Sequence, residues 1–174
     1  MEALETILTR RSVRRFENKL VEKKIIDQVL RAAMSAPSAG NNQPWHFIIV
    51  DDRAILNQIA DFHPNAKMCQ EAPLAIVVCA ATTVERYKDF WIQDVAAATE
   101  NILLAVRALG LGAVWVGVYP REDRVVAMKK LLNIPDAVTP FNIIPIGYSD
   151  VLQTSQDRYS DERVHYNRWL SKFL

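Results

Sequence analysis

The apolar run Leu74–Ala80 constrains the fold of this chain more than any other segment. Its residues, Leu-Ala-Ile-Val-Val-Cys-Ala, carry no charge. A strand that faces water on one side alternates apolar and polar residues, whereas a strand covered on both faces is apolar throughout. We therefore expect this run to form a buried strand in the centre of a sheet.

Helical and strand-like patterns alternate along the rest of the chain. Apolar residues at helical spacing predict helices over Leu4–Leu8, Glu22–Met34, Asp52–Phe62, Ile92–Leu109 and Val125–Leu132. Further strands are expected over His46–Val50, Ala113–Tyr119 and Phe141–Tyr148. Asp52 can cap the third helix, and Gly110 is placed to end the fourth. Taken alone, this alternation favours a doubly wound parallel sheet.

Length and charge exclude several classes of function. The chain has 174 residues, enough for one domain with a sizeable core, and its formal net charge is only +1. We therefore expect neither a nucleic-acid partner nor a membrane partner. The run Ile102–Val106 ends at Arg107 and is far too short to span a bilayer, and the first residues lack the pattern of a secretory signal. A cytoplasmic location is expected.

Most common catalytic spacings do not occur in the sequence. The glycines of Gly110-Leu111-Gly112 are followed by Trp115 where a dinucleotide fingerprint needs a third glycine, and they end a helix instead of opening one. The sequence contains no phosphate-binding loop of the kind found in nucleoside triphosphatases, and Ser38 lacks the flanking glycines of a nucleophile elbow. Acyl transfer therefore loses support.

Metal and disulfide chemistry are not indicated either. The histidines His46, His63 and His165 lack the pairing of helix-borne metal sites. Cys69 and Cys79 stand too far apart for a redox pair or a zinc knuckle, so we expect buried free thiols.

The segment Arg10–Arg15 holds four arginines, with Ser12 among them, between the first two predicted helices. Guanidinium groups match the oxygens of a phosphate, and a hydroxyl can add a further donor. An anion site and a solvated basic turn are both compatible with this segment alone.

The loop Ala36–Pro44 precedes the first predicted strand and contains two prolines, a glycine and adjacent asparagines. Its amides and hydroxyl both donate and accept hydrogen bonds, as needed to bind the ring edge of a heterocycle. The alternative is a tight turn in which Trp45 belongs to the core.

Four segments together resemble the FMN-dependent nitroreductase family over nearly the whole chain. They occur in the family's order, and they are Arg10–Arg14, Ala36–Trp45, Gly110–Gly117 and Ile143–Tyr148. The resemblance implies an α+β sandwich with a central, mostly antiparallel sheet flanked by helices. It also implies a single domain over residues 1–174, an intertwined homodimer with FMN at the subunit interface, and a C-terminal extension from about residue 149 that docks on the partner subunit.

The resemblance assigns candidate cofactor-binding residues. Those expected near the FMN phosphate and ribityl chain are Arg10, Arg11, Ser12, Arg14 and Arg158. The loop expected to reach the flavin from the second subunit contains Pro37, Ser38, Ala39, Asn41 and Gln43. Contacts to the ring and ribityl chain are expected from Asn65 and Lys67, and the backbone amide facing flavin N5 from Val116 and Gly117.

Two positions depart from the family pattern. Gln156 stands where many members have lysine, which removes one cation from the phosphate side. Gly117 stands where others have glutamate, but the implied contact there is made by the backbone. The aromatic residues Tyr87, Phe90 and Trp91 are expected either to wall the substrate pocket or to pack in the core.

The implied reaction is a ping-pong transfer in which NAD(P)H reduces FMN at N5 and the flavin then reduces a nitroaromatic, a quinone or a similar acceptor. The chemistry belongs to the cofactor, so no side chain is expected to act as a general acid or base. The alternatives are a non-catalytic FMN sensor or store, and a specialised member of the family that fragments flavin, removes halogen or oxidises a thiazoline.

The aromatic residues of the tail also favour docking on a partner. On a monomer, Trp169 and Phe173 would be exposed.

Overall fold

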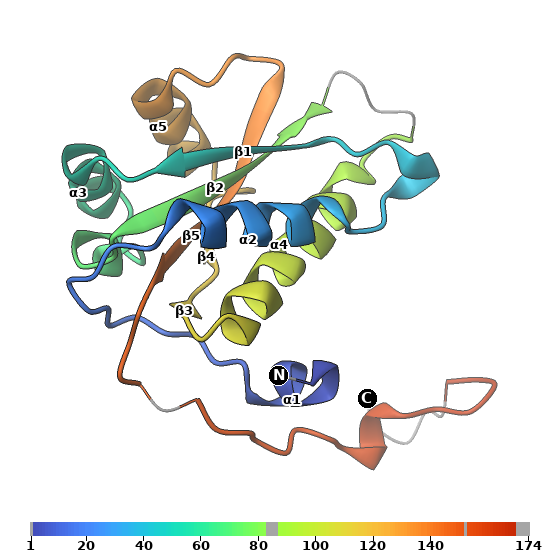
Figure 1. Ribbon diagram of the computed structural model, residues 1–174. Coiled ribbons are helices and arrows are strands. Elements are labelled where there is room, and N and C mark those ends of the chain that lie inside the picture. The colour runs from blue at the N-terminus through green and yellow to red at the C-terminus, as the bar shows by residue number, and fades with distance from the viewer. Residues whose placement is uncertain (1, 83–86, 152, 170–174) are drawn as a thin grey trace.

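The computed structural model describes residues 2–82, 87–151 and 153–169 (Figure 1). A five-stranded sheet forms its centre, in the order β1 (Trp45–Val50), β2 (Leu74–Ala81), β5 (Val138–Gly147) and β3 (Gly112–Ala113), with β4 (Val116–Gly117) also paired to β5. Every pair of these strands is antiparallel. The parallel sheet favoured by the alternation alone is therefore wrong, and the antiparallel sheet implied by the family resemblance is confirmed.

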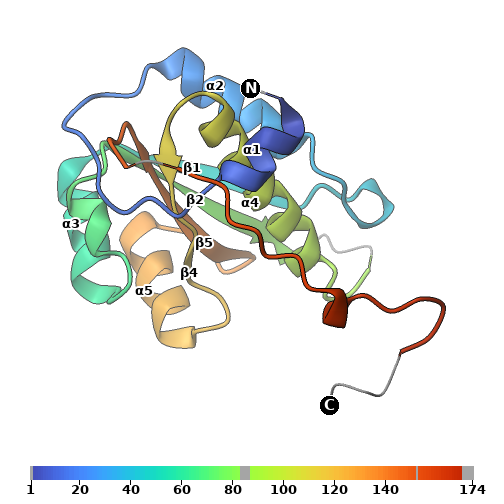
Figure 2. The same ribbon diagram turned by 90° about the horizontal axis from the view of Figure 1, so that it is seen from below.

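Four helices cover the two faces of the sheet (Figure 2). One layer contains α2 (Lys23–Met34) and α4 (Trp91–Ala108), and the other contains α3 (Arg53–Phe62) and α5 (Glu122–Leu132). The short helix α1 (Ala3–Thr9) lies beside α4. Two 3-10 turns, η1 (Ala39–Asn41) and η2 (Lys67–Gln70), precede β1 and β2.

The apolar run predicted to be a central strand is β2, which lies between β1 and β5. Successive side chains of a strand point to opposite faces, so β2 contributes to both cores. Ile76 and Val78 pack with residues of α2 and α4, whereas Val77 packs with residues of α3 and α5. All three are fully buried, and burying each of these side chains favours folding by about 1.5–3 kcal/mol.

The predicted helix ends are confirmed by their capping contacts. The carboxylate of Asp52 accepts hydrogen bonds from the backbone N–H groups of Ala54 (2.7 Å) and Ile55 (3.1 Å) at the start of α3. Gly110 follows α4 with a φ of +79°, a conformation that disfavours residues with a Cβ.

The single strand expected over residues 113–119 is wrong, because the structure divides it into β3 and β4. Both pieces keep one register against β5, with Ala113 opposite Ile146 and Val116 opposite Ile143. Pro145 therefore lies opposite Val114, and proline has no backbone N–H to donate. The ladder between the strands is interrupted where that donor is missing. The strand predicted over residues 141–148 corresponds to β5, which begins earlier, at Val138.

The arginine-rich segment is attached to the outer side of β3. The backbone N–H of Val13 donates to the carbonyl of Ala113 (2.9 Å), and Ser12 forms an isolated parallel bridge with Ala113. Val13 is fully buried. The segment is thus an ordered part of the fold, anchored by the buried side chain of Val13.

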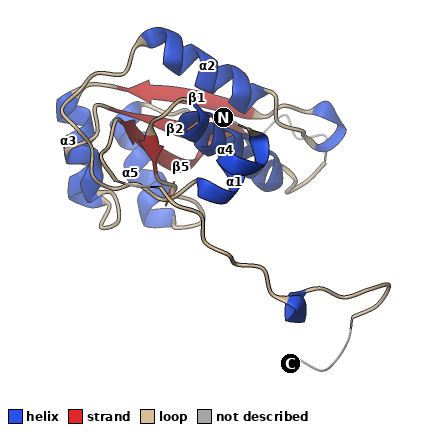
Figure 3. Ribbon diagram, turned by 60° about the horizontal axis from the view of Figure 1, so that its bottom comes forward, coloured by secondary structure: helices blue, strands red, loops and turns tan. Residues whose placement is uncertain are grey.

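The tail after β5 passes α1 and then extends away from the body of the molecule (Figure 3). Its one short turn is η4 (Asp161–Arg163) within the part of the tail that the structure describes. Tyr166 is 80% exposed and Trp169 is 66% exposed, as expected for a single subunit. Phe173 lies outside the described residues. Across the described ranges, no helix is long and apolar enough to cross a membrane.

Candidate functional site

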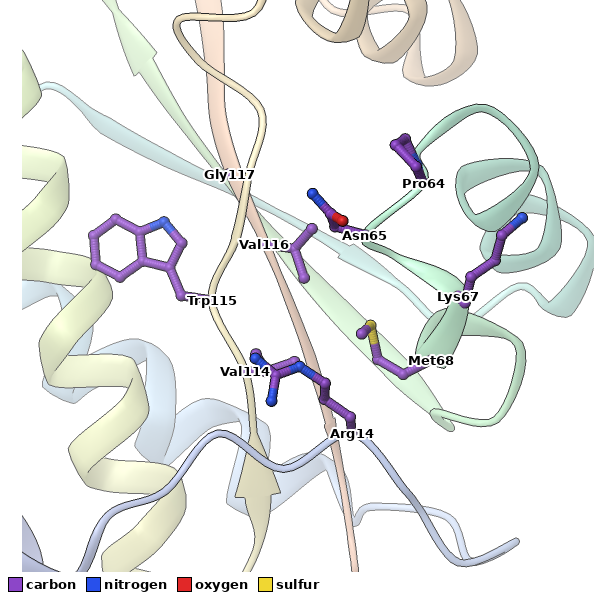
Figure 4. Close-up of a pocket in the computed structure, with 9 residues that line it drawn as sticks. All are labelled: Arg14, Pro64, Asn65, Lys67, Met68, Val114, Trp115, Val116 and Gly117. Atoms are coloured by element: carbon purple, nitrogen blue, oxygen red, sulfur yellow. The ribbon is translucent and has the colours of Figure 1, made fainter. Parts of the chain in front are cut away.

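A cavity of about 420 Å³ lies between the strand segment 114–117 and the η2 turn. We call it the central cavity (Figure 4), and its lining residues are Arg14, Pro64, Asn65, Lys67, Met68, Val114, Trp115, Val116 and Gly117. Figure 4 shows Asn65, Met68 and Val116 converging, whereas the indole of Trp115 lies on the other side of the strand. Side chains alternate along a strand, so Val116 and Trp115 point in opposite directions.

One wall of the central cavity is the η2 segment, which is held by long side chains from α3 and η2 itself. The guanidinium of Arg53 donates to the carbonyls of Cys69 (2.8 Å), Gln70 (2.7 Å) and Ala72 (2.5 Å). Lys67 turns its ammonium to the carbonyl of Ala60 (2.8 Å), so its charge is engaged with the protein rather than projected into the cavity. These hydrogen bonds hold this wall of the cavity in place without a ligand.

The opposite wall presents the backbone of Gly117. Val118 donates its N–H to the carbonyl of Phe141 (3.0 Å), and hydrogen-bonded and non-hydrogen-bonded pairs alternate in an antiparallel ladder. Gly117, paired with Asn142, therefore occupies a non-hydrogen-bonded position, where its N–H and C=O both point away from β5. The carbonyl confirms this direction, because side chains outside the sheet bind it.

Two side chains donate to the carbonyl of Gly117. The ring Nε2 of His63 lies 2.8 Å from this oxygen, and Nη1 of Arg124 lies 3.1 Å from it. His63 is fully buried, and its Nδ1 accepts the backbone N–H of Asn65 (3.2 Å). Burial lowers the pKa of His63, while its bond to Gly117 opposes that shift, and the Arg124 charge lowers it further. The imidazole is therefore neutral near pH 7.

A second cavity, of about 300 Å³, lies beside the first and shares Arg14 with it. We call it the arginine cavity, and its lining residues are Arg10, Arg11, Ser12, Arg14 and Arg158. Four cations and a hydroxyl line this space. Arg10 also pairs with the carboxylate of Glu100 (3.4 Å), which does not line the cavity, so the cations outnumber their carboxylate partner and the space suits a ligand that carries negative charge.

The arginine cavity joins the two ends of the sequence. The side chain of Gln153 accepts the backbone N–H of Arg11 (3.3 Å) and donates to the carbonyl of Leu111 (3.3 Å). Arg107 of α4 donates to the hydroxyl of Thr9 (3.0 Å) and to the carbonyl of Gln153 (3.4 Å). These contacts place the tail across the end of α1 and bring Arg158 to the arginine segment.

The loop residues predicted for the site lie elsewhere. Pro37, Ser38, Ala39, Asn41 and Gln43 precede β1, and none of them lines either cavity. The loop is nevertheless tightly built, since Ser38 Oγ accepts the N–H of Gln43 (3.0 Å) and the Asp94 carboxylate accepts the N–H of Ala39 (2.9 Å). Asn41 and Gln43 both have positive φ, at 56° and 48°. Such backbone strain is concentrated at functional sites.

The structure thus brings together two of the three predicted groups. Arg14, Asn65, Lys67, Val116 and Gly117 line the central cavity, and the remaining arginines with Ser12 line the arginine cavity. Sequence reasoning did not single out Pro64, Met68, His63 or Gln153. Their contacts depend on long-range packing, and the local signal is limited to two polar residues, His63 and Asn65, on either side of a proline directly after an apolar helix.

Of the three aromatic residues considered for a substrate pocket, Trp91 is in the core. It is 6% exposed, and its ring packs edge-on against Tyr119 (4.9 Å between centroids) and Phe141 (6.1 Å). Tyr87 and Phe90 are each 46% exposed and contact each other. None of the three lines the central cavity.

Neither cysteine lines the two cavities. Cys69 and Cys79 are free and buried, and burial raises the pKa of each thiol to about 12. Among the described residues, no group of three or more histidine, cysteine, aspartate or glutamate side chains could hold a metal ion.

Comparison with known proteins agrees with the fold. The model of the nitroreductase family matches residues 7–63 and 63–148. A protein of Methanothermobacter thermautotrophicus, named "Putative NADH dehydrogenase/NAD(P)H nitroreductase", is 46% identical over 169 residues, which cover 97% of this chain and 88% of that protein.

Solved structures give the same result. A protein of the same name from Parabacteroides distasonis is 44% identical and superposes with a TM-score of 0.92 over 96% of this chain and 98% of its own. An FMN-dependent nitroreductase from Clostridium difficile is 31% identical, with a TM-score of 0.88 over 95% of this chain and 99% of its own. The family model and these relatives together show that the chain belongs to the nitroreductase family.

Proposed function

We propose that the protein is an FMN-dependent oxidoreductase that takes electrons from NAD(P)H and passes them to nitroaromatics, quinones or similar small acceptors. The observation that carries this proposal is the pair of adjoining cavities. One is cationic, the other is lined by an amide side chain and an outward-facing backbone, and Arg14 belongs to both. A ligand with a phosphate at one end and a polar heterocycle at the other matches this division.

The residues at the phosphate end fit FMN. Arg10, Arg11, Arg14 and Arg158 would surround the phosphate, with Ser12 as a hydroxyl donor. Each charge-assisted hydrogen bond is worth about 1.5–3 kcal/mol before the cost of desolvation. Several such bonds are enough to retain a cofactor without a covalent link.

The residues at the ring end also fit. Gly117 directs its N–H away from β5, and a Cβ at this position would meet nothing within 4 Å, so the backbone is open to a ligand. Asn65 lies across the cavity from it. When bound, FMN would supply the hydride chemistry at N5 in a ping-pong cycle. The chain binds and orients the ring, and no side chain has to donate or abstract a proton.

The remaining candidates are best explained by a homodimer. The strained loop containing Ser38 and Asn41 is partly exposed and lines neither cavity of its own chain, so it is available to complete the site of a second subunit. The exposed aromatics Tyr159, Tyr166 and Trp169 would be buried if the tail docked on that subunit. In this proposal, residues 1–174 form a single FMN-binding domain with a docking extension.

The test begins with the visible spectrum of the purified protein, before and after addition of FMN. The expected result is a flavin spectrum, followed by steady-state NADH or NADPH oxidation with menadione or a nitrofuran as acceptor. Protein that stays colourless after FMN is added would contradict the proposal. Bound flavin with negligible turnover would instead identify a sensor or store, and sedimentation of the flavin-loaded protein as a monomer would remove the dimer from the proposal.

A further inference from the structure

A polar cluster outside the arginine cavity contains His63, Gly117 and Arg124, and its histidine is fully buried. It joins three elements, because His63 follows α3, Gly117 lies in β4 and Arg124 lies in α5. His63 is completely buried, and burying a polar ring is costly unless its nitrogens are bonded. Both nitrogens of this ring have partners in the backbone of the central cavity.

The hydrogen bonds fix the protonation pattern of His63. The backbone N–H of Asn65 can only donate, so Nδ1 must accept and carry no proton. Nε2 then carries the proton and donates it to the carbonyl of Gly117 at 2.8 Å. The neutral ring therefore links the two walls of the central cavity, with Asn65 on one side and Gly117 on the other.

Arg124 adds a second donor to the same oxygen. Its Nη1 lies 3.1 Å from the Gly117 carbonyl, so the two lone pairs of that oxygen are both used. The Nε of Arg124 is buried and has no hydrogen-bond partner among the described residues. An unpaired buried donor costs free energy. Favourable solvation of the Arg124 guanidinium therefore does not explain where this side chain lies.

The peptide between Gly117 and Val118 is thereby held on both sides. Its oxygen is bound by His63 and Arg124, and its N–H donates to the carbonyl of Phe141 (3.0 Å). Rotation of this peptide would break all of these bonds together. The preceding amide, the N–H of Gly117, is therefore fixed in its direction away from β5 and toward the cavity.

We infer that His63 and Arg124 are positioning residues that aim the Gly117 amide at the cofactor ring. The inference rests on the proposed function, since the Gly117 amide has this role only when a flavin ring is bound in the central cavity. A purely structural role is the alternative, but it does not account for two donors converging on the main chain of the cavity wall while the same histidine also holds Asn65.

The first experiment uses the protein without added cofactor. In a long-range proton–nitrogen NMR spectrum at pH 7, His63 is expected as the neutral ring with the proton on Nε2. A proton on Nδ1, or a doubly protonated ring, would overturn the inference. The chain has only 5 glycines, so the amide signal of Gly117 can be followed, and it should shift in His63→Leu and Arg124→Met.

The second experiment measures single-turnover reduction of bound FMN by NADH, together with the FMN dissociation constant and the thermal midpoint. His63→Leu and Arg124→Met should slow reduction by about tenfold to a hundredfold, because small misplacements at a reacting centre have effects of this size. His63→Gln and Arg124→Lys keep a donor and should recover part of the rate. Lys130→Met removes an exposed cation from the same helix and should leave the rate unchanged.

The outcomes separate the alternatives. His63→Leu and Arg124→Met could lower the thermal midpoint and leave the rate of FMN reduction unchanged. That result would show that the cluster has only a structural role, and it would overturn the inference. If the wild-type protein binds no FMN, the proposed function fails and the role toward the ring fails with it. The NMR spectra would still show, in that case, whether His63 and Arg124 hold the Gly117 peptide.

Discussion

The central cavity and the arginine cavity share Arg14, yet they are held in different ways. The walls of the central cavity are fixed by buried, neutral or fully engaged groups, such as His63 on Gly117 and Arg53 on the carbonyls of η2. The arginine cavity is lined by two half-buried cations, Arg10 and Arg11, and two exposed ones, Arg14 and Arg158, and an ion pair joins Arg10 to Glu100 at 3.4 Å. The first is held by contacts within the protein, whereas the second gathers positive charge that a bound anion would offset.

This difference predicts that substitutions at the arginine cavity change binding more than stability. The double substitution Arg11→Ala with Arg158→Ala removes two cations of the cavity. FMN affinity should fall by about 3 kcal/mol or more, a hundredfold or more, reduced by whatever water recovers. Titration of FMN fluorescence measures this loss. Arg31→Ala, which removes an exposed arginine of α2, is the control, and unchanged affinity in the double variant would remove both residues from the site.

A pair of glycine substitutions distinguishes the two regions by stability. A Cβ on Gly112 would come within 2.6 Å of the Val13 side chain, the buried anchor of the arginine segment, whereas a Cβ on Gly117 would meet nothing within 4 Å. Gly112→Ala should therefore cost about 1–3 kcal/mol of unfolding free energy. Gly117→Ala should change it by no more than about 0.5 kcal/mol. Urea unfolding of both variants compares them, and equal losses would contradict the packing described for Val13.

Part of the pH dependence of stability should come from His63, which is bonded to the wall of the central cavity. Because the pKa of His63 is lowered in the folded protein, the unfolded chain binds more protons as the pH falls through about 6.5. Stability should therefore decrease on acidification below that value. The neighbouring charges are Arg124, which favours the neutral ring, and Asp123, which opposes it. Urea midpoints at pH 7.5 and 5.5 should differ less in His63→Gln than in the wild type, and an equal difference would exclude His63 as the source.

The smallest effect is expected at the ion pair of the arginine cavity. The side chains of Arg10 and Glu100 are 24% and 46% exposed, and exposed pairs contribute about 0–1 kcal/mol. Glu100→Gln should lower the unfolding free energy by less than about 1 kcal/mol. A larger loss in urea unfolding would show that this end is held as firmly as the central cavity, and the contrast between the two regions would fail.

The sequence was sufficient to predict the main elements because their patterns are local. The helical spacing of Ile92–Leu109, the cap at Asp52 and the apolar run of β2 each reflect their immediate neighbours. The division of β3 from β4 was not predictable in this way, because it depends on Pro145 lying opposite Val114 across the sheet. A pairing register is a property of two distant segments, and neither contains it alone.

The same limit applies to the site. The arginine segment could be recognised from its composition, but its contact with the tail through Gln153 joins residues at opposite ends of the chain. His63 could not be identified from its surroundings in the sequence, since a histidine after an apolar helix is as compatible with a surface turn as with a buried link. Its role follows from the two backbone groups that the fold brings to its ring.

The most direct test of the cofactor assignment compares FMN with riboflavin, which lacks the phosphate. In the proposed assignment, both ligands bind in the central cavity, but only FMN has a phosphate for the arginine cavity. The wild-type protein should bind FMN at least about a hundredfold more tightly than riboflavin, given charge-assisted bonds of about 1.5–3 kcal/mol each. Equal dissociation constants for the two flavins would contradict the assignment of the arginine cavity to the phosphate.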